Sequence, residues 1–105
     1  MRYDEPIFFQ EVQRGQYNAA TGDYEDGAIL ETMRRASVTD SGAETMNLIY
    51  GTIKQGSKTI RLQRPYREIF DRIRIGSKIY RVDFARQLES KHVFVVSEVQ
   101  TNGNT

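Results

Sequence analysis

The sequence predicts a mostly β protein, a small antiparallel β-barrel or sandwich of about six strands with one short helix or helical loop. Its 105 residues fit one domain. Its apolar residues alternate with polar ones more often than they follow a helical period, which is typical of strands. Glycine-containing turns separate these short runs. We therefore expect one domain over residues 1–105, with an ordered core from about 6 to 100 and flexible ends at 1–5 and 101–105.

Four segments show the alternation of strands most simply. The first two run over residues 8–13 and 28–39, on either side of a loop at 17–24 that contains a glycine. The other two run over residues 58–63 and 92–100, each with aliphatic side chains at every second position. Their lengths and spacing predict short strands joined by turns.

A hairpin over residues 71–84 is the clearest local signal. Gly76-Ser77 suits a two-residue type II′ turn, because glycine readily takes the positive φ of its first position. This register sets Ile73 opposite Tyr80 and assigns one face of the hairpin to the core. The residues of that face are Ile73, Ile75, Tyr80 and Val82.

The opposite face of the hairpin is basic. The register sets Arg72 opposite Arg81, and like charges directly across a sheet destabilise it. We expect a negative group to offset this repulsion, such as Asp83, Glu98, a partner's carboxylate or a phosphate. Ordinary solvation of an exposed face is the alternative. The predicted basic face comprises Arg61, Arg64, Arg72, Arg74 and Arg81.

A short helix is predicted between the strands. Ser41 and Glu44 have the spacing of a capping box, in which each side chain bonds the other residue's backbone N–H. Gly51 is placed to end the helix, and a strand over residues 46–53 is the alternative. The apolar run exceeds what so short a helix needs for its own packing, so we expect it to anchor a neighbouring protein. This candidate docking segment comprises Ser41, Glu44, Met46, Leu48, Ile49 and Tyr50.

The sequence contains no recognised catalytic or metal-binding motif, so we expect no enzyme, no cofactor and no metal. The chain has no cysteine and a single histidine, His92, which excludes thiolate zinc sites and a Cys–His pair. The acidic run 23–27 fails the calcium-loop spacing because its glycine comes one place early. The run 51–59 fails the phosphate-loop pattern because Ser57 separates Gly56 from the lysine.

Charge is divided unevenly along the chain. Residues 1–50 hold four arginines against nine acids, a net charge of −5, and residues 51–105 hold eleven basic residues against five acids, a net charge of +6. This asymmetry fits a nucleic-acid face, an assembly in which acidic and basic surfaces of neighbouring subunits meet, or halves that interleave and are simply solvated. No apolar run is long enough to cross a bilayer, so we expect no membrane partner.

Several motifs follow one another in an order typical of a known family. They are Thr21-Gly22-Asp23, Ser37-Val38, Ser41-Gly42-x-Glu44, Thr59-Ile60-Arg61-Leu62 and Asp71-Arg72-Ile73-Arg74-Ile75-Gly76-x-Lys78-x-Tyr80-x-Val82. Over most of the chain, residues 6–100, the sequence resembles the head–tail connector proteins of tailed bacteriophages, also called head-closure, stopper or minor capsid proteins. The hairpin is the most specific of these motifs.

The resemblance implies a small β-barrel or sandwich whose subunits assemble as a homo-oligomeric ring. Such a ring joins the portal of the DNA-filled head to the tail, so the implied partners are portal or adaptor proteins, tail proteins and, non-specifically, the DNA in the channel. The implied location is the virion, assembled in the cytoplasm of the bacterial host. The alternative function is a small β-barrel module that binds nucleic acid, which needs basic residues and exposed aromatic residues on one surface.

Overall fold

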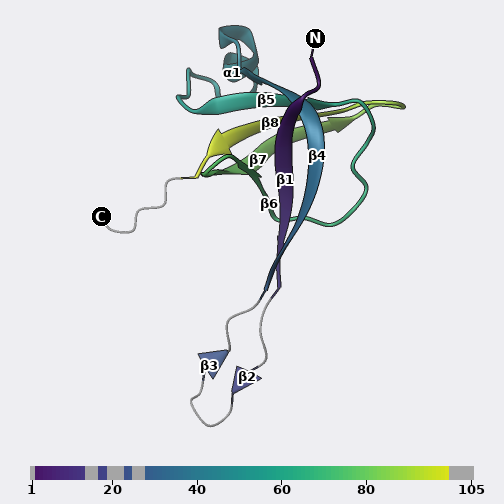
Figure 1. Cartoon of the computed structure of the whole chain (residues 1–105). Coiled ribbons are helices and arrows are strands. Elements are labelled where there is room, and N and C mark those ends of the chain that lie inside the picture. The colour runs from purple at the N-terminus through teal and green to yellow at the C-terminus, as the bar shows by residue number, and fades with distance from the viewer. Residues whose placement is uncertain (1, 14–16, 19–22, 25–27, 100–105) are drawn as a thin grey trace.

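Six antiparallel strands form a closed barrel in the order β1-β4-β5-β8-β7-β6 (Figure 1). The computed structural model describes residues 2–13, 17–18, 23–24 and 28–99. The strands of the barrel are β1 (Glu5–Val12), β4 (Ile29–Asp40), β5 (Ser57–Leu62), β6 (Arg72–Ile75), β7 (Lys78–Gln87) and β8 (His92–Glu98). A helix, α1 (Ala43–Tyr50), joins β4 to β5, and two short strands, β2 (Tyr17–Asn18) and β3 (Asp23–Tyr24), pair with each other. The predicted fold class, a mostly β barrel with one short helix, is confirmed.

The core fills the barrel with aliphatic and aromatic side chains from the strands. The largest of its fully buried apolar side chains are those of Ile7, Phe9, Ile60, Ile73, Phe94 and Val96. Tyr66, in the loop after β5, closes one end of the core by stacking on Phe9, with ring centroids 3.7 Å apart. Full burial of such side chains contributes about 1.5–3 kcal/mol each, so this core is the main source of stability.

Strands β1 and β4 form a long ribbon whose far end leads to β2 and β3 (Figure 1). β6 pairs with β1 only from Phe8 to Gln10, which leaves the last residues of β1 without a neighbour on that side. There the carboxylate of Asp71 accepts a hydrogen bond from the backbone N–H of Val12 at 2.7 Å. Because an unpaired strand edge invites pairing with another chain, this bond protects the edge.

The hairpin of β6 and β7 confirms the predicted register. Ile75 pairs with Lys78 and Ile73 with Tyr80 across a turn in which Gly76 has a φ of 60°. The four residues assigned to the core do pack there, Ile73 and Tyr80 fully and Ile75 and Val82 in part. The ladder ends at Ile73 and Tyr80, however, so the predicted pair of Arg72 and Arg81 does not form.

Strand β7 is longer than the predicted hairpin. It continues to Gln87 and turns back into β8, with the backbone N–H of Leu88 donating to the carbonyl of Lys91 at 2.8 Å. A bulge between Val82 and Phe84 shifts its register with β8. Such a bulge reverses the direction of the side chains that follow it.

Helix α1 confirms the helical prediction against the strand alternative. It ends at Gly51, whose φ of 74° is left-handed and whose N–H donates to the carbonyl of Asn47. The predicted capping box is wrong. Gly42 is the N-cap, no side chain caps the helix, and Ser41 gives its N–H to the carbonyl of Ser57.

Several predictions concern the ends and loops of the chain. β1 begins at Glu5, inside the segment 1–5 that was expected to be flexible. The tail 101–105 lies outside the described residues, as do half of the loop 17–24 and three residues of the acidic run 23–27. In the part of the chain that the structure describes, no helix has the length and apolar character needed to cross a membrane.

Candidate docking groove

A groove of about 650 Å³ lies between α1 and the outer face of the barrel. The helix sits over β5, and β8 and β7 continue the face beyond it (Figure 1). The residues that line the groove are Thr45, Leu48, Ile49, Thr59, Arg61, Asp83, Phe84, Arg86, Leu88, Val93 and Val95. About half of these lining residues are apolar, and charged residues lie between them, as in many protein interfaces.

Large apolar side chains on both sides of this groove face solvent. Leu48 of α1 is 82% exposed, and Phe84 and Leu88, on the β7 side, are 45% and 41% exposed. Single exposed apolar residues are ordinary on protein surfaces, but several around one concavity are typical of an interaction site. The groove is therefore the candidate docking site of this protein.

Polar bonds hold the start of α1 on the barrel. The hydroxyl of Ser57 donates to that of Ser41 at 2.8 Å, and the Ser41 and Thr59 hydroxyls share a hydrogen bond at 3.0 Å. All three residues are buried. This chain of hydroxyls explains why Ser41 does not cap the helix, since its oxygen is already engaged with β5.

The end of α1 is held by Tyr50 and Asp83. The Tyr50 hydroxyl donates to the Asp83 carboxylate at 2.5 Å, and Arg81 Nε lies 3.1 Å from the other carboxylate oxygen. Burial raises the pKa of Asp83, but hydrogen bonds from Ser97 and Tyr50 and the charge of Arg81 outweigh it and hold the pKa below its ordinary value. Burial, together with the bond to Asp83, raises the pKa of Tyr50. Asp83 therefore stays ionised and Tyr50 protonated at neutral pH.

The predicted docking segment divides into two groups. Ser41 and Tyr50 attach the helix to its own barrel, and the Met46 sulfur accepts the backbone N–H of Lys54, in the loop that follows the helix, at 3.4 Å. Leu48 and Ile49 line the groove, and Glu44 is exposed on the first turn. Leu48 is exposed, whereas Met46, Ile49 and Tyr50 are half-buried, so Leu48 offers a partner the largest free apolar side chain of this segment.

Sequence patterns did not point to the residues on the β7 side of the groove. Strict alternation would place Phe84 beside Tyr80 and Val82 in the core. The bulge instead pairs Phe84 with Val95, which is buried in the lining of the groove, and so brings Phe84 to the groove. No local signal in the sequence marks this bulge.

Two arginines of the predicted basic face are engaged within the chain. Arg74 makes a bidentate contact with Glu31 of β4, at 2.7 and 3.0 Å, and its guanidinium lies 4.1 Å from the centroid of the Phe8 ring. Arg72 Nε donates to the side-chain oxygen of Gln10 at 2.6 Å. The hydrogen bond from Arg74, with a second from Gln10, lowers the pKa of Glu31 from 4.5 to about 2.

The other three arginines of that face lie in different surroundings. Arg81 pairs with Asp83, one of the acids expected to offset its charge. Arg61 lines the docking groove. Arg64 lies in the loop after β5, beside Arg34 and Arg35. The five residues therefore do not form one continuous basic surface.

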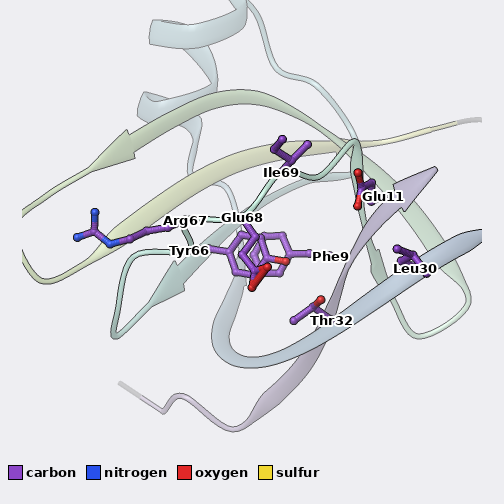
Figure 2. A pocket seen from close by; sticks show the side chains of 8 residues that line it. All are labelled: Phe9, Glu11, Leu30, Thr32, Tyr66, Arg67, Glu68 and Ile69. Atoms are coloured by element: carbon purple, nitrogen blue, oxygen red, sulfur yellow. The ribbon is translucent and has the colours of Figure 1, made fainter. Parts of the chain in front are cut away.

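A second hollow, of about 470 Å³, lies beside the stack of Phe9 and Tyr66 at the end of the barrel (Figure 2). His92, the single histidine, lies near this end, where β8 begins. Its Nδ1 accepts the backbone N–H of Tyr66 at 3.1 Å and its ring packs on Phe94, so it has a structural role there. Within the described residues, no three histidine, aspartate or glutamate side chains gather to hold a metal.

The fold and the groove define a small β-barrel with a candidate protein-docking surface. No protein-family model matches the chain, and no curated protein sequence is similar to it.

Proposed function

We propose that this protein is a structural component of a tailed-bacteriophage virion, a head–tail connector. In this role its subunits form a homo-oligomeric ring between the portal of the DNA-filled head and the tail. The proposal is supported by the resemblance of its motifs to the connector family, with which the small barrel and its short helix agree. Its partners are then portal or adaptor proteins on one side and tail proteins on the other, and it is assembled in the cytoplasm of the bacterial host.

The observation that carries this proposal is the exposed helix beside the groove. None of the residues of α1 is fully buried, and Leu48 leaves 82% of its surface in solvent. A helix of eight residues is unstable alone and normally gains stability by covering its apolar side. In a ring, a neighbouring subunit or the next ring of the junction would cover Leu48 and the groove. A head-to-tail contact repeated around an axis closes such a ring.

The nucleic-acid-binding module is the weaker alternative. It requires basic and exposed aromatic residues together, whereas the predicted basic face is divided and two of its arginines pair with acids of the same chain. Tyr80, the aromatic residue of the hairpin, is buried. The groove, by contrast, has the apolar character of a protein-docking surface.

The direct test is a nonsense mutation in the gene of the phage that encodes this chain. Electron microscopy of the lysate should show complete unattached tails together with empty or DNA-leaking heads. Complementation of this mutant with the Leu48→Asp variant should fail to join heads to tails. Complementation with Asn47→Asp should succeed, because it adds the same charge at the neighbouring exposed position without removing apolar surface. Normal virions from the nonsense mutant would overturn the proposal.

A further inference from the structure

One end of the barrel gathers arginines from two elements. At this end β5 and β7 finish and β8 begins, since Leu62 and Gln87 both pair with His92. The loop that leaves β5 carries Arg64 and Arg67, and the bond from the Tyr66 N–H to His92 fixes it against β8. The loop, with the two arginines it carries, is therefore held in a fixed position at this end of the barrel.

Strand β4 adds Arg34 and Arg35 to this end. They line a hollow of about 280 Å³ together with Arg64, Gln63, Leu62 and Pro65. The Arg34 guanidinium lies 5.3 Å from the centroid of the Tyr66 ring, which ties β4 to the loop. Arg67 projects away from the stack of Phe9 and Tyr66 (Figure 2). We call Arg34, Arg35, Arg64 and Arg67 the arginine end.

The arginine end has no carboxylate partner within the described part of the chain. Arg74 and Arg81 each pair with an acid, whereas among the described residues the side chains of Arg34 and Arg35 donate to backbone carbonyls, of Met33 at 2.9 Å and Asp4 at 3.3 Å. All four arginines of the arginine end are exposed. The positive charge of Arg67 also affects His92. It is the second cause, after the burial of the histidine, of the lowered pKa of His92. Four such charges at one end repel one another and favour an external anion.

We propose that the arginine end binds the phosphate backbone of duplex DNA without regard to sequence. Arginine forks match phosphate oxygens, and contacts of this kind supply most of the affinity in non-specific binding. An acidic protein surface fits less well, because protein interfaces centre on apolar or aromatic anchors. In this hollow Leu62 is buried and Pro65 half-buried, which leaves arginine and glutamine facing outward. Single strands also fit less well, since Tyr66 is buried and cannot stack on a base.

The test is fluorescence anisotropy with a labelled 20-base-pair duplex at a series of salt concentrations. The wild-type chain should bind with a Kd in the range of about 1–100 μM near physiological salt and more tightly at 50 mM salt. The double variant Arg34→Gln, Arg64→Gln should reduce the slope of log K against log salt by about 2 and weaken binding at least tenfold at 50 mM salt. The double variant Arg34→Lys, Arg64→Lys should keep most of the slope. This result would show that the glutamine variant loses DNA affinity because it loses charge and not because it misfolds.

A matched control removes two charges at the other end of the barrel. Lys58 and Lys78 lie there, each beside an acid, Asp40 and Glu98. The variant Lys58→Gln, Lys78→Gln should bind DNA as the wild type does. Equal weakening in both glutamine variants would show that only net charge matters and would overturn the proposal. So would binding of poly-glutamate in place of duplex DNA, or no duplex binding at 50 mM salt. None of these outcomes depends on ring assembly, so the connector proposal is judged separately.

Discussion

The hydroxyl of Tyr50 donates a hydrogen bond of 2.5 Å to the carboxylate of Asp83, and this bond joins the last turn of α1 to β7. Asp83 follows Val82 at the bulge in β7, so the same irregularity that turns Phe84 toward the groove also places Asp83 under the helix. The groove therefore depends on this pair, because α1 forms one of its two walls. Loosening the pair should alter the groove without disturbing the core.

Replacing Tyr50 with phenylalanine removes the hydroxyl and leaves Asp83 with fewer donors. Hydrogen bonds to charged groups contribute about 1.5–3 kcal/mol, so we expect Tyr50→Phe to lower the free energy of unfolding by about 1–2 kcal/mol. Urea unfolding followed by circular dichroism measures the change. In a double-mutant cycle with Asp83→Asn, the two losses should not add. Additive losses would show that the two side chains act independently.

Acid should weaken the ribbon of β1 and β4 through Glu31. The pKa of this carboxyl is about 2 in the folded chain because Arg74 and Gln10 bond to it, against an ordinary value of 4.5. A depressed pKa gives stability that is present above pH 4.5 and is lost as the pH falls toward 2. We expect the urea midpoint of the wild type to fall over that range. Glu31→Gln should be less stable than the wild type at pH 7 and should lose less on acidification; an equal loss in both would contradict the assignment.

The turn of the hairpin depends on one glycine. Gly76 has a φ of 60° with open space around its Cα, so an added Cβ meets no neighbour and the only penalty is backbone strain. Gly76→Ala should therefore lower the free energy of unfolding by about 1–2 kcal/mol. Ser77→Ala is the control, because Ser77 has no positive φ and is exposed, and it should change stability by less than about 0.5 kcal/mol. Similar effects of both variants would exclude strain as the cause.

The features that the sequence predicted correctly are those that residues close together along the chain determine. The register of the hairpin follows from Gly76 and its neighbour, and the end of α1 follows from Gly51, since only glycine takes a positive φ without penalty. The capping box failed because Ser41 bonds with Ser57 and Thr59, residues 16 and 18 positions away, which no local pattern contains.

The candidate sites depend even more on contacts between residues that are far apart in the sequence. The five arginines of the predicted basic face share the same residue type, but their partners decide what each can do. Arg74 is neutralised by Glu31, 43 positions away, whereas Arg64 joins Arg34 from another strand. Neither relationship follows from spacing along the chain, because each arises only when β4 closes the barrel between β1 and β5.

The pKa of His92 should report the charge of the arginine end. Burial lowers this pKa below its ordinary value of 6.5, and the charge of Arg67 lowers it further. The neutral imidazole is therefore favoured in the folded chain, and its contribution to stability is full above pH 6.5 and is lost as the pH falls through the folded pKa.

Arg67→Gln should raise the pKa of His92, as measured by NMR titration of its ring protons. Arg67→Lys should keep it low, because the charge remains. Lys91→Gln removes the adjacent cation in the sequence and should leave the pKa unchanged. An effect of Lys91→Gln as large as that of Arg67→Gln would mean that the histidine responds to overall charge and not to Arg67.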